Sequence, residues 1–206
     1  MSNKMKVEIT LTEEMLGTAC GNKQVYTEMI GSKSADADKL KEELSSLPSE
    51  ELEAKGRTVF HRDEKTGRPF LYDYQVKGFF KEAVGIQCDL NDAEIKIGKT
   101  KLSKYSHKKI VDNFLFIGPR KIYLSNDVGE DCVRPLRADT MRGERVALAC
   151  SETVPAGTTF TFEMEELSGS LSFWSILCNC LDYGKMKGFG QWRNSGKGRF
   201  NWKRIV

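Results

Sequence analysis

The feature that most constrains this chain is a glycine-rich, basic segment near its C-terminus, residues 184–199. It reads GKMKGFGQWRNSGKGR and holds five glycines, five basic residues and two aromatic residues, without an acidic residue. Glycine permits positive φ and lets the backbone approach another group closely, and exposed backbone N–H groups can together form a concave site for an anion. The segment lacks the Walker pattern. It also follows a predicted helix and precedes a predicted strand, whereas a dinucleotide-binding fingerprint follows a strand and opens a helix.

Charge is unevenly distributed along the 206 residues. The net charge is +3, yet residues 184–206 carry +7 and residues 1–183 therefore carry −4. Residues 36–53 contain seven acidic residues against two lysines. This segregation predicts an anion-binding C-terminal region and a separate acidic, helical insertion at about residues 32–56 that does not contact nucleic acid. Residues at about 89–113 are polar and rich in lysine, which predicts an exposed basic excursion.

Hydrophobic periodicity predicts a single α+β domain over residues 1–206. Apolar residues alternate over 5–11 and 159–166, the pattern of half-buried strands. An apolar stripe at helical spacing follows Asp73, a good N-cap, and a second, mostly buried helix is predicted over 171–183. The remaining predicted elements are an amphipathic helix within 40–52, a hairpin that joins 58–62 to 69–72, and strands over 114–117, 121–124, 145–150 and 198–206. This order predicts a ferredoxin-like βαββαβ core with large insertions.

The residue content of segment 184–199 favours single-stranded nucleic acid as its ligand. Basic side chains neutralise phosphates, and aromatic rings such as Trp192 stack on bases. The competing interpretation is a solvated surface loop whose aromatic residues anchor it to the core. The predicted contact residues are Lys185, Lys187, Gly188, Gly190, Gln191, Trp192, Arg193, Asn194, Gly196, Lys197, Gly198 and Arg199. Arg193 and Lys197 flank the expected tip of the loop, so their charges are expected to reach the ligand.

Four features, in the same order along the chain, resemble the RAMP superfamily, the RRM-like proteins that form the RNA-binding backbone and RNA-processing subunits of CRISPR effector complexes. They are an opening strand followed by glycine over 11–17, the loop and helix start over 72–83, the sequence VPAGTTF over 154–160, and the glycine-rich stretch 188–199 before the closing strand. The resemblance implies that Lys77 of the Lys77-Gly78 pair contacts the RNA backbone. It also implies RNA, further RAMP-type subunits or a second copy of this chain as partners. A divergent relative of the family, carried by a phage or another mobile element, fits the same resemblance.

Candidate catalytic residues are few. Some members of the family that the chain resembles cleave RNA without metal, using a histidine or a tyrosine–lysine arrangement for general acid–base transfer, so His107, beside Tyr105 and several lysines, is the candidate for such a role. The favoured alternative is an exposed histidine in a loop that contacts phosphate. His61 is expected to be structural. Asp36, Asp38, Asp89 and Asp92 are expected to be solvated loop residues, and the Cys178-x-Cys180 spacing does not fit a zinc site. We therefore predict no metal and no cofactor.

Three hypotheses follow for the function. The first is a non-catalytic protein that binds single-stranded RNA, with single-stranded DNA as the other ligand considered. The second is a metal-independent endoribonuclease of the same fold, with His107 as acid or base. The third is a protein-binding inhibitor or mimic of a RAMP-containing complex. The sequence has no apolar run long enough for a membrane span and no secretory signal, and its six cysteines read as reduced thiols, so a cytoplasmic location is expected.

Overall fold

The computed structural model describes residues 2–21, 45, 57–90, 95–97, 99–140 and 143–205. The helices in this part of the chain are α3 (Asp73–Leu90), α4 (His107–Phe114) and α5 (Leu171–Lys187), with a short 3₁₀ turn, η1 (Arg193–Ser195). The strands are β1 (Asn3–Leu11), β2 (Met15–Leu16), β3 (Ala19–Cys20), β4 (Arg57–Val59), β5 (His61–Arg62), β6 (Pro69–Tyr72), β7 (Lys96–Ile97), β8 (Thr100–Lys101), β9 (Leu115–Gly118), β10 (Lys121–Tyr123), β11 (Cys132–Thr140), β12 (Gly143–Ser151), β13 (Thr153–Val154), β14 (Thr159–Glu166) and β15 (Phe200–Ile205). The chain therefore combines α-helices and β-sheets, as the sequence predicts.

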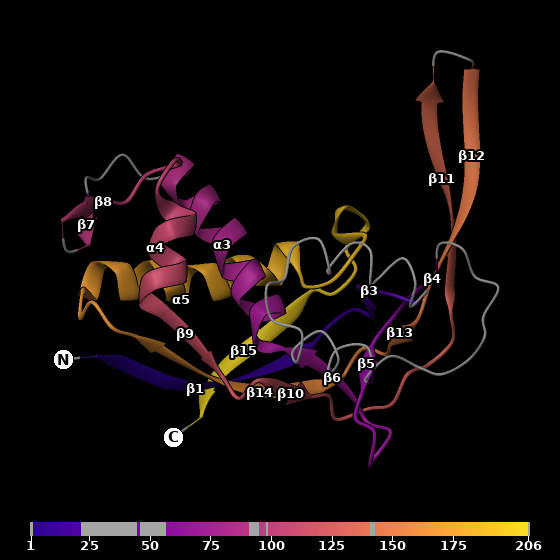
Figure 1. Cartoon of the computed structure of the whole chain (residues 1–206), viewed down its shortest axis with the longest axis horizontal. Helices are drawn as coiled ribbons and strands as arrows, with labels where there is room; N and C mark the ends of the chain where they lie inside the picture. The colour runs from indigo at the N-terminus through magenta and orange to yellow at the C-terminus, as the bar shows by residue number, and fades with distance from the viewer. Residues whose placement is uncertain are drawn as a thin grey trace.

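The principal sheet has four antiparallel strands in the order β15-β1-β14-β9. Helices α3 and α5 cover one face of this sheet (Figure 1). The alternation predicted for the two central strands is confirmed, because Val7 lies opposite Phe162 and both are fully buried beneath the helices. Residues on the other face of β1 and β14 are polar, and several pair across strands, as Lys4 does with Glu163. The hydrophobic core therefore lies between the sheet and its helices.

Helix α3 forms where the sequence predicts a helix. The Asp73 carboxylate accepts a hydrogen bond from the Tyr74 N–H at 2.8 Å, and so satisfies one of the donors left open at the helix start. Its apolar stripe is buried as expected: Val76, Phe79, Phe80, Ala83 and Val84. Helix α5 is longer than predicted. It ends at Lys187 rather than near residue 183, so the first residues of the glycine-rich segment form its last turn.

The lysine-rich stretch 89–113 is only partly an exposed excursion. It contains the β7-β8 hairpin and helix α4, and it contributes Ile97, Leu102, Ile110 and Val111 to the core. Its lysines lie on the solvent side of these elements. The prediction of an exposed basic excursion therefore holds for the lysines, whereas Ile97, Leu102, Ile110 and Val111 join the core, the last two on the helix that packs against α3.

A long hairpin, β11-β12, projects from the body of the molecule (Figure 1). The sequence predicts only part of its second strand and misses the first, because Arg134 and Pro135 interrupt any apolar alternation. The base of the hairpin joins the body through the parallel pair of β12 with β4. The predicted acidic insertion and its helix lie outside the described residues, apart from Ser45. Among the described helices, none has the length and apolar character needed to cross a membrane.

Candidate nucleic-acid interface

The glycine-rich segment is fixed to the core by Phe189. The Phe189 ring stacks on Phe200 with centroids 4.7 Å apart and contacts Phe79 at 4.6 Å. Gly184, in the last turn of α5, makes room for this arrangement, because a Cβ atom there would lie 1.9 Å from the Phe200 ring. One aromatic residue of the segment is thus a core anchor, in agreement with the competing interpretation of the sequence.

The glycines close the loop on itself. The Phe189 N–H donates to the Gly198 carbonyl at 2.8 Å, and the Gly198 N–H donates to the Glu14 carbonyl at 2.7 Å. Gly198 has φ +72, and a Cβ atom there would lie 2.0 Å from the Phe189 carbonyl oxygen. Gly188, Gly190 and Gly196 also have positive φ. Close approach within the protein therefore requires glycine at 188, 190 and 198, and positive φ favours it at 196. The N–H groups of Gly188, Gly196 and Gly198 are used internally rather than in an open anion nest.

Several cations of the segment are engaged in ion pairs. The Arg193 guanidinium lies 2.8 Å from a Glu82 carboxylate oxygen, and Lys187 lies 3.7 Å from the same carboxylate. Lys197 donates to Glu14, a hydrogen bond that raises the pKa of this lysine. Arg193 and Lys197, whose charges are expected to reach the ligand, therefore each have an acidic partner within the protein.

The outer rim of the segment carries its more exposed polar groups. Lys185 is 48% exposed and pairs with Asp182 on the same helix, which lowers the pKa of that carboxyl. The exposed Arg199 side chain donates through Nε to the Met186 carbonyl at 3.0 Å. Asn194 lies exposed in η1. These side chains keep donor groups available to a phosphate.

Trp192 joins the segment to the base of the β11-β12 hairpin. Its ring is 42% exposed, and the guanidinium of the buried Arg134 lies 5.3 Å from the ring centroid. Arg134 also donates to the Gln191 side chain at 3.0 Å and to the Ser151 hydroxyl at 3.1 Å. Trp192 has φ +52, a left-handed conformation unusual for a bulky residue. The indole is therefore held at the surface beside the hairpin, in a position from which it can stack on a base.

A pocket of about 230 Å³ opens between this segment, β2 and the first half of α3. Its walls are mainly apolar and include Met15, Leu71, Phe79 and Phe189. Gln75, Glu82 and Arg193 supply polar groups, and Gly78 and Gly190 line it as well. The sequence analysis did not identify this pocket, because its walls come from segments up to 178 residues apart. A mostly apolar cavity with a few convergent polar groups is typical of a ligand site.

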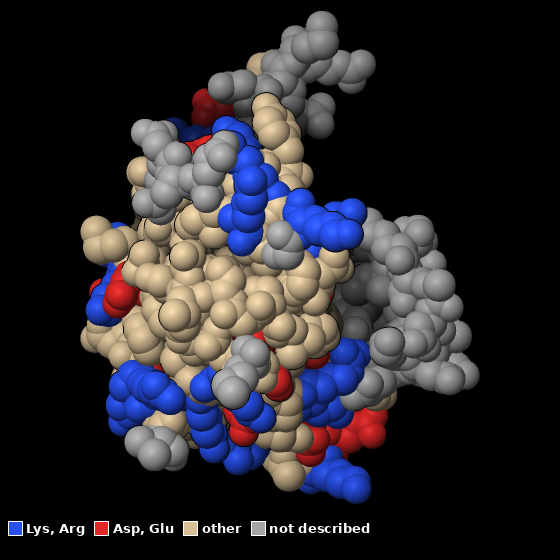
Figure 2. All heavy atoms as spheres, turned by 90° about the vertical axis from the view of Figure 1, so that its left-hand side faces the viewer, with Lys and Arg blue, Asp and Glu red and all other residues tan. Residues whose placement is uncertain are grey.

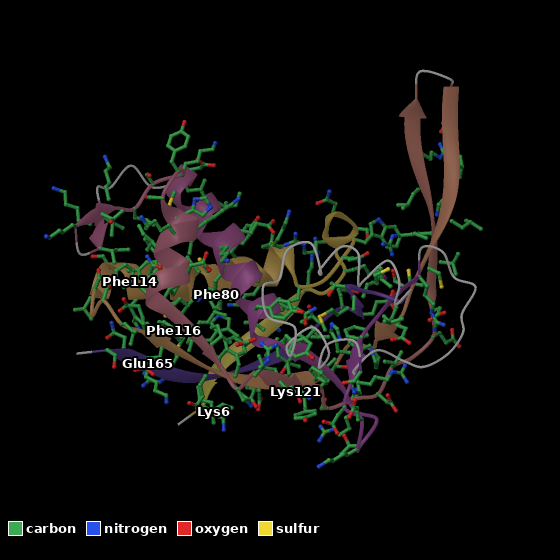
Figure 3. All side chains as sticks on the ribbon, viewed as in Figure 1. Lys6, Phe80, Phe114, Phe116, Lys121 and Glu165 are labelled. Atoms are coloured by element: carbon green, nitrogen blue, oxygen red, sulfur yellow. The ribbon has the colours of Figure 1, made fainter. Side chains whose placement is uncertain are left out.

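Lys77 does not join the glycine-rich segment. Its ammonium group donates to the Asp112 carbonyl at 3.0 Å and lies 5.1 Å from the centre of the Phe116 ring. Phe116 lies on β9, on the side of α3 away from the segment (Figure 3). Burial lowers the pKa of Lys77. The structure therefore brings together the residues predicted over 185–199 and leaves Lys77 on another flank of the helix.

The two histidines occupy packed positions. The His107 ring lies against Gly85, where an added Cβ atom would be 3.0 Å from Nε2, and its Nδ1 is 2.7 Å from the Lys104 carbonyl oxygen. His61 is buried beside Phe70 and Tyr72, and burial lowers its pKa to about 4. The interpretation of His107 as an exposed loop residue was therefore wrong, because the ring begins α4 and packs against α3.

The described residues contain no cluster of three or more potential metal ligands. Asp36, Asp38 and Asp92 lie outside the described residues, whereas Asp89 lies 3.6 Å from Lys104. Burial raises the pKa of the Cys180 thiol, as expected for a cysteine packed in the core.

Comparison with known proteins identifies a likeness of fold. No protein-family model matches the sequence, and no curated protein matches it. Among solved structures, the chain is similar to a chain in the structure of the type III-B Cmr-beta complex bound to cognate target RNA, with a TM-score of 0.52 and 11% sequence identity. The match covers 100% of this chain and 60% of that chain, so this protein spans about three-fifths of the length of its structural neighbour. The likeness is therefore to one chain of a structure that holds target RNA, and it concerns the fold.

Proposed function

We propose that this chain is a non-catalytic, single-stranded RNA-binding subunit of a nucleoprotein assembly, built on a RAMP-like, ferredoxin-like βαββαβ core. The observation that carries the proposal is the pre-formed loop of the glycine-rich segment, which holds Trp192, Lys185 and Arg199 at the surface and contributes Phe189, Gly190 and Arg193 to the lining of a mainly apolar pocket. Exposed rings and cations on a fixed backbone are what a flexible, charged single strand requires. The strand order β15-β1-β14-β9 and the likeness to a subunit of an RNA-bound complex support the same assignment.

The projecting hairpin supports a place in an assembly. Val133, Val146 and Leu148 are each more than half exposed, and the register of β11 and β12 puts them on one face. A two-stranded hairpin is marginally stable by itself, and grouped exposed apolar side chains are typical of interaction surfaces. We therefore assign this face to contact with another protein subunit.

Filling the pocket is expected to weaken RNA binding without disturbing the fold. A Cβ atom at Gly78 would meet no other atom within 4 Å, so a larger side chain fits there and extends into the pocket. If one base occupies the pocket, Gly78→Leu is expected to weaken binding at least fivefold, since a stacked base contributes about 1–3 kcal/mol. Fluorescence anisotropy with a labelled oligoadenylate measures this change.

Gly78→Ala is the matched control for this substitution. It is expected to raise the free energy of unfolding by about 0.5–1 kcal/mol, because alanine favours a helix interior over glycine, and to leave RNA affinity near the wild-type value. Equal affinity of the Leu variant and the wild type would remove the pocket from the proposed interface.

The exposed cations of the rim are expected to set the salt dependence of binding. Lys185→Gln combined with Arg199→Gln removes two charges whose internal partners are exposed, so the melting temperature should change little. The slope of log K against log salt concentration should become shallower by about 1.4, because single strands give about 0.7 per neutralised phosphate. Lys65→Gln, an exposed lysine in the β5-β6 turn, is the control. An unchanged slope in the double variant would place the phosphates elsewhere.

A further inference from the structure

A second basic surface lies at the opposite end of α3 from the glycine-rich segment. It consists of Lys104, Tyr105, Lys108 and Lys109, at the start of α4, and we call it the Lys–Tyr surface. Tyr105 is 97% exposed, more than any other large hydrophobic residue in the described part of the chain. Figure 2 looks at the end of the molecule that carries β7, β8 and α4, and basic side chains lie along both its upper and its lower edge. Packing within the protein therefore does not account for an aromatic ring at position 105.

The turn that carries Tyr105 is firmly built. The N–H groups of Ser106 and His107 both donate to the Ser103 carbonyl, at 3.1 and 2.9 Å. The Ser106 hydroxyl donates to the Lys101 carbonyl at 2.6 Å, and the Lys104 carbonyl lies 2.7 Å from His107 Nδ1. Behind the turn, the His107 ring packs on α3. Tyr105 is thus held out to solvent by a fixed backbone, which lowers the entropic cost of stacking a partner on its ring.

The charge of the Lys–Tyr surface is largely uncompensated. Lys104 lies 3.6 Å from Asp89 and is itself 66% exposed. In the described part of the chain, Lys108 and Lys109 are exposed and have no acidic partner within ion-pair distance. Lys4 and Lys203 on the outer face of the principal sheet differ, since they pair with Glu163 and Glu8 there. Lysine supplies point charges rather than bidentate forks, which suits phosphates along a strand.

We propose that the Lys–Tyr surface is a second contact for the same RNA strand. One base of the strand stacks on Tyr105, and the neighbouring phosphates of the strand lie near Lys108 and Lys109. This inference rests on the proposed function. Gly78, at the pocket, and Asp89, beside Lys104, are separated along α3 by about 16 Å, at 1.5 Å per residue. A strand must therefore extend beyond the glycine-rich segment to reach Tyr105. Binding of a short and of a long RNA can therefore distinguish the contact at the glycine-rich segment from the contact at Tyr105.

The test compares a short and a long labelled oligoadenylate, of about 3 and about 20 nucleotides. At about 3.4 Å per stacked nucleotide the short RNA does not span both contacts, whereas the long RNA exceeds the roughly 4–16 nucleotides that one small binding fold covers. Tyr105→Ala is expected to weaken binding of the long RNA at least fivefold and to leave the short RNA unaffected. Tyr105→Phe should restore affinity, because the ring is retained. Lys108→Gln with Lys109→Gln should make the salt slope shallower by about 1.4 for the long RNA only, and Lys65→Gln should change neither RNA.

Each other outcome overturns the inference. If the wild type binds both RNAs and the Tyr105 and lysine variants bind them equally well, the second contact fails while the proposed function stands. If those variants instead lose binding of poly-L-glutamate, the surface serves an acidic protein. Wild-type protein that binds neither RNA would end the proposed function itself. A loss with Lys65→Gln as large as with the lysine pair would reduce the effect to general electrostatic attraction.

Discussion

Replacing Phe189 by alanine is expected to lower the free energy of unfolding by about 3–5 kcal/mol, the usual cost of removing a buried phenylalanine ring. The ring is 5% exposed and contacts Phe79, Phe160 and Phe200, so no neighbour can close the space without moving the sheet or α3. The same ring fixes the glycine-rich segment, so RNA affinity should fall even under conditions in which the variant remains folded. Urea denaturation measures the first effect and anisotropy the second.

Trp192→Ala is the matched control for the Phe189 variant. The indole is 42% exposed, and its contact with Arg134 is worth about 0.5–1 kcal/mol at an exposed site. The free energy of unfolding of Trp192→Ala should therefore fall by no more than about 1 kcal/mol. Its RNA affinity should fall, because the substitution removes the ring that is proposed to stack on a base. A large loss of stability for Trp192→Ala with a small one for Phe189→Ala would reverse the two roles.

Periodic sequence patterns predict the central elements of this fold well. All five residues of the predicted α3 stripe are buried, and the alternation of β1 and β14 correctly gives the buried face of each strand. These signals are local, because each depends only on the spacing of apolar residues within one element. The glycine-rich segment was also placed correctly between a helix and the last strand.

The site itself depends on contacts that sequence reasoning could not supply. Glu14 and Lys197 are 183 residues apart, and nothing in the neighbourhood of either residue indicates the other. The glycines presented a different difficulty. A glycine that admits a ligand and a glycine that admits the protein's own backbone look alike in sequence, and only the closeness of Gly198 to Phe189 distinguishes them. The first hairpin strand was missed because Arg134 is buried by partners from the loop and from β12 rather than by apolar neighbours.

A buried carboxylate, Glu152, connects the base of the hairpin to the β4-β5 region. Its side chain accepts hydrogen bonds from the Phe60 N–H and from Arg62, both at 2.9 Å, and lies 3.6 Å from Arg57. Within the described residues, the buried Nε atoms of Arg57 and Arg62 have no hydrogen-bond partner. Glu152 is the carboxylate that both guanidinium groups share, and Arg57 has a second acidic partner in Asp131 at 3.1 Å. Neighbouring Ser151 binds Arg134, which in turn contacts Gln191 and Trp192.

Glu152→Gln is expected to lower the free energy of unfolding by about 3 kcal/mol, because breaking a buried ion pair leaves uncompensated charge in a poorly solvated place. Asp131→Asn is the matched control. It removes the same charge from a second partner of Arg57, but that carboxylate is a third exposed, so its loss should cost no more than about 1 kcal/mol. Urea denaturation of the two variants measures the difference. Equal and small effects would mean that water reaches the arginines and compensates them in place of Glu152.

The same two variants are expected to differ in RNA affinity. Glu152 directly follows Ser151, whose hydroxyl accepts a hydrogen bond from Arg134, the residue that contacts Gln191 and Trp192. RNA affinity should therefore fall in the Glu152 variant and not in the Asp131 variant.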